Sequence, residues 1–285
     1  MKFLNKKQAI VENNENIEEN VENTTTEIIE SDNIETTENG DVEYMLDIDH
    51  LSKKYLNSPH YSVTDLTIKV KKGEIFGFLG QNGAGKSTTI KCLTGIYPFD
   101  SGDIKVNGYS IKTEPLKAKL NIGYVPDNHA VYDNLTGREY VNCIADLYGV
   151  SEEDRTARLE EYLKIFKLGF AIDRQIKGYS HGMKQKICII AALIHQPKLW
   201  VLDEPMVGLD PQSIFEIINR MKAHVSSGNT VFFSSHNIDL VAKLCDRVAI
   251  IHDGQLCTIM DLNEGCNRDR LEDVFRGYTM KENRE

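Results

Sequence analysis

Long apolar segments are missing from this chain of 285 residues. Its longest uninterrupted apolar run, from Ile187 to Ile194, has eight residues, whereas a helix that crosses a membrane needs about 20. No apolar stretch follows residues 1–7, so the sequence also lacks the pattern of a secretory signal peptide. We therefore expect neither a membrane-spanning helix nor a cleaved leader.

Paired cysteines are missing as well. The six cysteines include no Cys-x-x-Cys pair, and several lie within apolar segments. Scattered thiols of this kind are typical of reduced core residues and suit a disulfide framework or a zinc site less well. They are Cys92, Cys143, Cys188, Cys245, Cys257 and Cys266. We expect a cytosolic protein.

Positive charge and aromatic residues are scarce in the first 43 residues. This segment has 12 acidic side chains and three lysines, with no aromatic residue between Phe3 and Tyr44. It cannot bury enough apolar surface to offset the entropy lost on ordering, so we predict a disordered, acidic, low-complexity tail over 1–43. A weak heptad pattern leaves open a helix that forms on a partner. That pattern consists of Ile10, Ile17, Val21 and Ile28.

Residues 44–285 are nearly neutral, with a net charge of −1 out of −10 for the whole chain. A large nucleic-acid-binding face requires clustered positive charge. We therefore expect no nucleic acid among the partners. The 41% apolar content of the chain suffices for a proper core.

Strand and helix patterns alternate from residue 44 onward. Strands are expected at 63–70, 103–106, 199–202, 230–234 and 247–252. The turns Asn107-Gly108 and Asp253-Gly254 each indicate a hairpin. Strands separated by helices indicate an α/β fold with a mostly parallel sheet, into which the mainly helical block at about 128–190 is inserted.

Three helix starts carry capping signals. Thr136 and Glu139 form a capping-box pattern, Ser151 is a good N-cap, and Asp210 precedes a proline at the first helical position. We expect the helix that begins at Thr136 to be amphipathic. The side chains it should bury are Tyr140, Ile144, Leu147 and Tyr148.

A glycine-rich motif follows the apolar run Ile75–Leu79. It has the form Gly-x4-Gly-Lys-Ser-Thr, which joins a strand to a helix in nucleotide-binding proteins. Glycine permits turns that aim backbone N–H groups inward, and the helix N-terminus adds its positive dipole end. Lys86 would reach the β- and γ-phosphates, and Ser87 would hold Mg²⁺. The predicted triphosphate site consists of Gly80, Gln81, Asn82, Gly83, Ala84, Gly85, Lys86, Ser87 and Thr88.

Two carboxylates end a second apolar strand. The run 199–202 leads into Asp203 and Glu204, at the edge of the sheet where ligands of such folds bind. Asp203 would hold Mg²⁺ through water, and Glu204 would polarise the attacking water. A strand that ends in Asp-Glu is commonplace, but 117 residues after Lys86 it makes a specific pair with the glycine-rich motif.

Three further motifs accompany these two. Tyr179-Ser180-His181-Gly182-Met183 precedes the carboxylates, Gly208-Leu209-Asp210-Pro211 follows them, and His236 follows the strand 230–234. In this order the motifs resemble those of the ATP-binding subunits of ABC transporters, across essentially all of residues 44–276. The segment Leu271-Glu272-Asp273-Val274-Phe275 is similar to the ending of stand-alone subunits of bacterial drug, antibiotic and bacteriocin exporters.

The resemblance implies a P-loop (RecA-like), mostly parallel sheet core with an antiparallel β subdomain and an inserted helical subdomain. It also implies a head-to-tail dimer, with an identical or paralogous subunit, around two ATPs. The other subunit's Ser180 and Gly182 would contact the γ-phosphate of each ATP. His236 would bind the γ-phosphate and orient Glu204, and Asp210 would contact across the dimer.

An aromatic residue that stacks on adenine is the remaining element of the family pattern. Tyr55 occupies the matching position, and Tyr61 is the weaker candidate. The alternative for Tyr55 is a side chain that fills the edge of a strand.

Several positions depart from the family pattern. His181 and Met183 stand where glycine and glutamine are usual, and Met206-Val207 follows the Asp-Glu-Pro sequence where Thr-Ser is commoner. We expect His181 to be a tolerated surface side chain. Asp127 occupies the position of a glutamine that senses Mg²⁺ and couples to the membrane partner. Our hypothesis is that Asp127 keeps this role with an altered Mg²⁺ dependence, the alternative being a solvated loop aspartate.

We therefore predict a Mg²⁺-dependent ATPase at 44–276, followed by a short polar tail at 277–285. From the inner face of the membrane it would drive a separately encoded multi-span permease, and the resemblance implies that the transporter is an exporter. The main alternative is a soluble ABC-type ATPase that acts on ribosomes or DNA. Such proteins usually have two cassettes or long coiled coils, whereas this chain has one phosphate loop and only 94 residues between Lys86 and Ser180. A P-loop kinase leaves Ser180 and His236 without a role.

Overall fold

The computed structural model describes residues 44–56, 58–128, 131–265 and 267–279. These residues belong to one compact unit. The acidic segment 1–43 with its heptad pattern, Cys266 and residues 280–285 lie outside the described part, so the predictions made for them stay predictions. Within the described ranges, no helix combines the length and the apolar character that a bilayer crossing requires.

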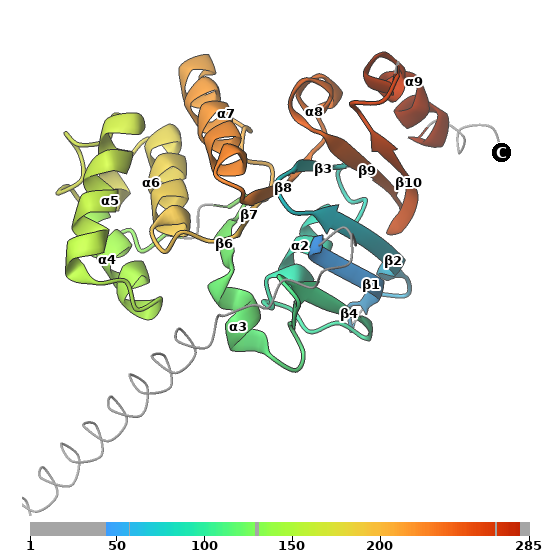
Figure 1. Cartoon of the computed structure of the whole chain (residues 1–285), viewed down its shortest axis with the longest axis horizontal. Helices are drawn as coiled ribbons and strands as arrows, with labels where there is room; N and C mark the ends of the chain where they lie inside the picture. The colour runs from blue at the N-terminus through green and yellow to red at the C-terminus, as the bar shows by residue number, and fades with distance from the viewer. Residues whose placement is uncertain (1–43, 57, 129–130, 266, 280–285) are drawn as a thin grey trace, which may run out of the picture. The chain divides into compact units, whose positions relative to one another are not determined.

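Two sheets organise the described residues (Figure 1). The antiparallel sheet has the order β2-β1-β4-β5. It consists of β1 (Tyr44–Lys54), β2 (Tyr61–Lys71), β4 (Ser101–Val106) and β5 (Tyr109–Ser110). The other sheet has the order β10-β9-β3-β8-β7-β6 and is parallel except for the β9/β10 pair. It consists of β3 (Ile75–Leu79), β6 (Ile122–Val125), β7 (Leu199–Leu202), β8 (Thr230–Ser235), β9 (Arg247–His252) and β10 (Gln255–Asp261).

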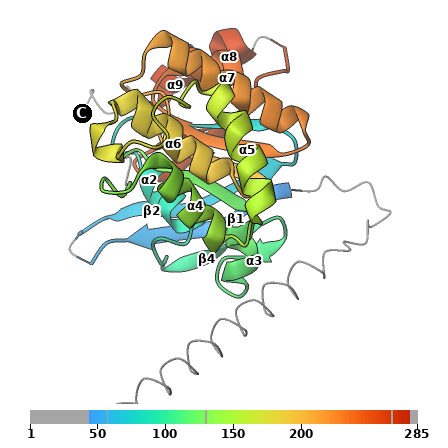
Figure 2. The same ribbon diagram turned by 90° about the vertical axis from the view of Figure 1, so that its left-hand side faces the viewer.

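The helices fall into groups around the parallel sheet. In Figures 1 and 2, α4, α5 and α6 gather at its β6 edge as the helical insertion, and α7, α8 and α9 lie together on one side of the sheet. The helices are α2 (Lys86–Leu93), α3 (Pro115–Leu120), α4 (Gly137–Leu147), α5 (Glu152–Ile165), α6 (His181–Leu193), α7 (Pro211–Ser226), α8 (Ile238–Leu244) and α9 (Asn267–Thr279), with a short 3₁₀ helix at Ile176–Gly178. The predicted P-loop fold, with its antiparallel and helical additions, is confirmed.

Alternating side chains of the parallel sheet fill two separate cores. Phe76 and Phe78 of β3 pack with α2 and the antiparallel sheet, and the ring of Phe76 stacks on that of Phe232 from β8 at 5.8 Å. Ile75 and Leu79 point to the other face, which α4 to α9 cover. A strand buried on both faces reads as a continuous apolar run, which explains the pattern 75–79.

The predicted turns and caps are present. Asn107-Gly108 and Asp253-Gly254 have positive φ at both residues, the conformation that joins hairpin strands without splaying them. The capping box of Thr136 and Glu139 forms in both directions at α4. Ser151 and Asp210 cap α5 and α7.

The expected buried face of α4 is partly wrong. Leu147 is 75% exposed, whereas Val141 and Ala145 are fully buried. Residues 137, 141 and 145 are spaced by one helical turn and form the stripe that meets the core, and Tyr140 lies beside it. Leu147 falls outside this stripe, since it is two positions from the nearest stripe residue.

Candidate active site

The glycine-rich loop connects β3 to α2, as predicted. Gly83 and Gly85 have φ angles of 87° and 103°, in the left-handed region that favours glycine. A Cβ atom on Gly85 would lie 2.6 Å from the carbonyl oxygen of Ser62. Position 85 therefore requires glycine for two reasons: its backbone conformation is left-handed, and a side chain would have no space.

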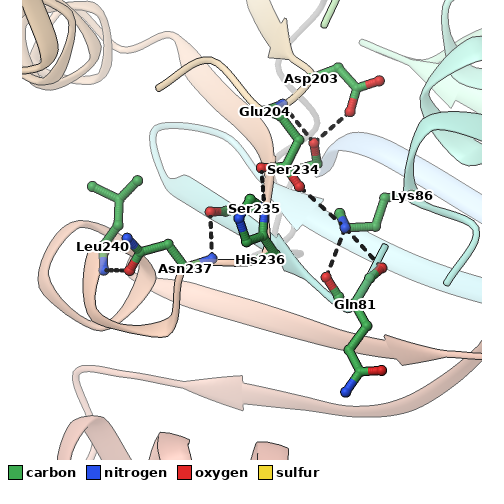
Figure 3. A network of polar contacts seen from close by, with 10 residues as sticks. Gln81, Lys86, Asp203, Glu204, Ser234, Ser235, His236, Asn237 and Leu240 are labelled. Carbon is green, nitrogen blue, oxygen red and sulfur yellow. Dashed lines mark hydrogen bonds and ion pairs between the residues drawn. The ribbon is translucent and has the colours of Figure 1, made fainter. Parts of the chain in front are cut away.

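Lys86 is the first residue of α2, and its side chain is only 5% exposed. Its Nζ donates to the carbonyl oxygens of Gly80 at 2.7 Å and Gln81 at 3.1 Å. It also lies 3.2 Å from Oε1 of Glu204 (Figure 3). A buried ammonium needs such partners, and phosphate oxygens entering the loop could take their place.

Glu204 is held from two sides. Its Oε2 lies 3.0 Å from Nδ1 of His236, and its backbone N–H donates to Oγ of Ser234 at 2.9 Å. Its φ of 48° is uncommon for a residue other than glycine, and such conformations persist where surrounding contacts enforce them. The carboxylate is therefore fixed in direction next to Lys86.

Ser234 links the two acidic residues that follow β7 (Figure 3). Its hydroxyl accepts from the N–H of Glu204 and donates to Oδ1 of Asp203 at 2.6 Å. Asp203 is 1% exposed, and burial raises its pKa. Hydrogen bonds from Ser234 and Ser87 oppose this rise in pKa, and the negative charges of Asp127 and Glu204 add to it.

The donor set around Asp203 fits a divalent cation. Its buried Oδ2 has no hydrogen-bond partner in the described part of the chain, so a carboxylate oxygen is available beside the hydroxyl of Ser87. The described ranges contain no group of three or more His, Cys, Asp or Glu side chains that could cage a metal. Mg²⁺ in phosphate sites suits such a sparse set, because water and the phosphates complete its octahedron.

A pocket of about 240 Å³ opens over the loop. It brings together most of the predicted loop residues with Asp127 and Glu204, which come from the ends of β6 and β7. Its lining consists of Ser62, Asn82, Gly83, Gly85, Lys86, Ser87, Thr88, Asp127 and Glu204. Glu204 and His236 both line an adjoining pocket, so the predicted catalytic groups converge on one place.

Tyr55 lies beside the end of the loop. Its hydroxyl is 3.1 Å from Oγ1 of Thr88, its ring meets Tyr97 edge-on with centroids 5.9 Å apart, and it is 38% exposed. Tyr61 is more exposed, with the Lys54 ammonium 5.6 Å from its ring centre. The position of Tyr55 suits stacking on a base bound next to the loop.

Ser180 and Gly182 do not line the pocket around Lys86. Ser180 is the exposed N-cap of α6. Asp210 caps α7, where its carboxylate accepts from the N–H and the hydroxyl of Ser213 at 3.0 and 2.6 Å, and these bonds lower its pKa. A single subunit therefore does not bring its own signature residues to its own loop pocket.

His181 is exposed, as expected of a surface side chain, but it also makes a specific contact. Its Nε2 lies 3.2 Å from the carbonyl oxygen of Val207, and a Cβ on Gly208 would be 3.1 Å from the same nitrogen. Two departures from the family pattern, His181 and Val207, thus meet in space.

Sequence reasoning missed two residues of the site. Ser234 bridges Asp203 and Glu204, and Ser62 lines the pocket from the start of β2. The two serines that end the apolar strand 230–235 were an available signal for Ser234. Polar residues at that end of the strand lie beside the carboxylates that follow the neighbouring strand. Ser62 carries no local signal, because only the packing of the two sheets brings it to the loop.

A phosphate loop that faces the carboxylates after another parallel strand of the same sheet defines a P-loop nucleoside triphosphatase. The sequence profile of the ABC transporter family matches residues 63–207. The linearmycin resistance ATP-binding protein LnrL of Bacillus subtilis (strain 168) is 41% identical over 224 residues, which cover 79% of this chain and 71% of LnrL. The chain belongs to the ABC transporter family, as an ATP-binding and ATP-hydrolysing subunit of a transporter.

Solved structures agree with this assignment. One described as "Structure of ATP binding subunit of ABC transporter" matches with a TM-score of 0.74 and 32% identity, over 84% of this chain and 97% of that chain. The ATP-binding cassette MJ0796, in a dimeric structure bound to ADP and Pi, matches with a TM-score of 0.70 over 78% of this chain and 100% of that chain. At 23% identity the second match supports the fold alone.

Proposed function

We propose that the chain is the motor subunit of an exporter, which dimerises head-to-tail around two Mg²⁺-bound ATPs and drives a separately encoded membrane permease. One observation supports the proposed dimer. Lys86, Glu204 and His236 converge on the loop pocket, whereas Ser180 and Gly182 lie outside it. A second subunit is the natural source of signature residues for that pocket.

In this proposal the chain's own groups divide the work of hydrolysis. Lys86 moves from the loop carbonyls and Glu204 to the β- and γ-phosphates, which leaves Oε1 of Glu204 free to accept a proton from water. His236 keeps Glu204 in place through Nδ1 and presents its other ring nitrogen toward the γ-phosphate. Ser87 and Asp203 would hold Mg²⁺, which neutralises phosphate charge when bound.

The signature residues would act from the start of α6. Free N–H groups and the positive dipole end make a helix N-terminus favourable for a phosphate, and Ser180 adds a hydroxyl that is exposed in this structure. Asp210, fixed by Ser213, would contact the facing subunit. Tyr55 would stack on adenine.

The exporter assignment rests on similarity to LnrL, a protein named for resistance to linearmycin. The permease would hold the chain at the inner face of the membrane and contact the helical insertion near Asp127–Asp133. Within the helical insertion, Tyr132 and Leu147 are 65% and 75% exposed, and exposed large apolar side chains are common at protein interfaces.

The test is a pull-down of the tagged full-length Glu204→Gln variant from detergent-solubilised native membranes with ATP and Mg²⁺. Recovery of one multi-span membrane protein in near-equal amount supports the proposal. Recovery of ribosomes, DNA or no membrane protein contradicts it. In parallel, light scattering should show an ATP-dependent dimer of Glu204→Gln that Ser180→Arg abolishes, because the bulky cation would block the facing loop.

A further inference from the structure

A second pocket lies at the far ends of the strands that carry the active site. It has a volume of about 280 Å³ and shares no lining residue with the pocket over the phosphate loop. Lys198 directly precedes β7 and Asn229 directly precedes β8. Asp203 and His236 follow the opposite ends of these two strands. The second pocket is therefore separate from the ATP site.

The walls of this pocket carry positive charge without any acidic residue. None of its eight lining residues is Asp or Glu. Lys198 and Arg220 both line it, and in the described part of the chain neither forms an ion pair with a carboxylate. Two cations that share a pocket without a counter-charge favour an anion between them.

Two buried polar atoms lack partners at the same place. Nε of Arg220 and Nε2 of His224 are inaccessible and have no hydrogen-bond partner among the described residues. His224 is only 4% exposed. A buried polar group without a partner costs about 1–3 kcal/mol, so a small rotation of either side chain toward an acceptor in the pocket would be favourable. Burial and the charge of Arg220 lower the pKa of His224 to about 4, which leaves a neutral ring that can donate one hydrogen bond.

The cationic side of the pocket is held in place. The guanidinium of Arg220 lies 4.9 Å from the ring centre of Tyr162, and its Nη2 donates to the Tyr162 hydroxyl at 3.0 Å. The N–H of Thr230 donates to the carbonyl oxygen of Lys198 at 2.8 Å, which ties the starts of the two strands together. Preorganised donors bind a ligand with less loss of entropy.

We propose that this pocket binds a small tetrahedral oxyanion, either inorganic phosphate or the phosphate group of a small metabolite. Arg220 and Lys198 supply the charge, and His224, Ser227 and Asn229 supply neutral hydrogen-bonding groups. At about 280 Å³, the pocket is close to the lower end of small-molecule sites, about 300 Å³. That size leaves room for a small organic group on the phosphate.

The test is isothermal titration calorimetry on the full-length chain with inorganic phosphate and, separately, glycerol 3-phosphate. A non-hydrolysable ATP analogue with Mg²⁺ keeps the phosphate loop occupied, so that the probes do not bind there. Arg220→Gln should weaken binding at least about tenfold and Lys198→Gln about threefold or more, since both remove charge-assisted hydrogen bonds. Lys222→Gln, on the exposed side of α7 and outside the pocket, is the charge-matched control and should bind as the wild type does.

Binding of either probe with this variant pattern supports the proposal, and preference for one probe identifies the source of the phosphate. Binding of neither probe overturns it, as does affinity that Lys198→Gln and Arg220→Gln leave unchanged, which would mean that ordered water satisfies the buried atoms. Arg220 also bonds Tyr162, so its variant could fold poorly. Lys198 is exposed, so Lys198→Gln should fold normally. If Arg220→Gln folds poorly, the phosphate affinity of Lys198→Gln tests the proposal.

Discussion

Nζ of Lys86 lies 3.2 Å from Oε1 of Glu204, so the two groups expected to act on one phosphate contact each other in this structure. Both side chains are largely buried, at 5% and 16% exposure. In the proposed function, an incoming γ-phosphate would compete for the ammonium and release the carboxylate. ATP binding would thereby free the group that is proposed to activate water.

Glu204→Gln should therefore lower hydrolysis without weakening ATP binding. The amide cannot accept a proton from water, so we expect kcat to fall at least about 100-fold. The Kd for ATP should stay equal or decrease, because Lys86 no longer has to break an ion pair with Glu204 before it can bind phosphate. Single-turnover hydrolysis and equilibrium binding of labelled ATP measure the two quantities. Wild-type turnover in this variant would remove Glu204 from its proposed role.

Ser234→Ala should raise the Mg²⁺ concentration that half-saturates ATPase activity. The variant loses the hydrogen bond to Oδ1 of Asp203 and the one from the N–H of Glu204. Losing these two bonds should lower the free energy of unfolding by about 1–3 kcal/mol. It should also raise the pKa of Asp203, since the serine hydroxyl lowers that pKa. Activity is measured against Mg²⁺ at fixed ATP.

Ser235→Ala is the matched control for Ser234→Ala. The neighbouring hydroxyl accepts from the N–H of Asn237 and, in the described part of the chain, makes no hydrogen bond to Asp203 or Glu204. Its loss should leave the Mg²⁺ dependence close to that of the wild type. Equal effects of the two variants would show that the bridge through Ser234 has no special role.

The sequence predicted correctly those site residues whose positions depend on a few consecutive residues. The loop 80–88 and the pair Asp203 and Glu204 were predictable because their function depends on a strand end and a helix start, both of which have local signals. Ser62 was not, because only the packing of the two sheets brings it to the loop. For Ser234 the sequence indicated a polar strand end, but its two partners depend on the pairing of β7 with β8. Register and packing decide such contacts, and a single sequence does not specify them.

The same distinction holds within the fold. The capping box at Thr136 depends on four consecutive residues and was predicted correctly. Exposure of Leu147 depends on how α4 lies against α6 and the core, so an apolar residue near the right period was assigned to the wrong face. His181 shows the same limit, since its contact with Val207 spans 26 residues.

Asp127→Ala should change the Mg²⁺ dependence of hydrolysis. Asp127 is exposed, lines the loop pocket and acts electrostatically on Asp203. If it offers oxygen to Mg²⁺, the alanine variant should need several-fold more Mg²⁺ for half-maximal ATPase activity. Asp127→Asn keeps one side-chain oxygen, so its Mg²⁺ requirement should lie between those of the wild type and the alanine variant. An unchanged Mg²⁺ titration for the alanine variant would mark Asp127 as a solvated loop residue.

His181→Ala should slow hydrolysis without unfolding the chain. The variant loses the bond from Nε2 to the carbonyl of Val207, which ties the start of α6 to the segment before Asp210. Because His181 is exposed, the free energy of unfolding should change by less than about 1 kcal/mol. A several-fold drop in kcat of the dimer with a normal melting temperature is the expected result. His181→Asn offers partial rescue, because its amide can also donate.

Buried histidines should make the fold sensitive to mild acid. The pKa of His195 is lowered to about 4, chiefly by burial, against 6.5 for a free histidine. The unfolded chain therefore binds a proton between these values that the folded chain does not, and stability present above about pH 6.5 is lost as the pH falls toward 4. Between pH 7 and pH 5 this histidine alone should account for about 2 kcal/mol.

His195→Gln tests this, because glutamine does not titrate and can still donate to the carbonyl of Ile122, as Nε2 of His195 does at 3.1 Å. The variant loses the stacking of His195 on Tyr148 at 3.7 Å, so it should be less stable at pH 7. Its free energy of unfolding from urea denaturation should nevertheless fall by about 2 kcal/mol less than that of the wild type between pH 7 and pH 5. His60→Gln, at an exposed position, should keep the wild-type pH dependence. Parallel pH profiles for all three proteins would show that His195 is not neutral in the folded chain.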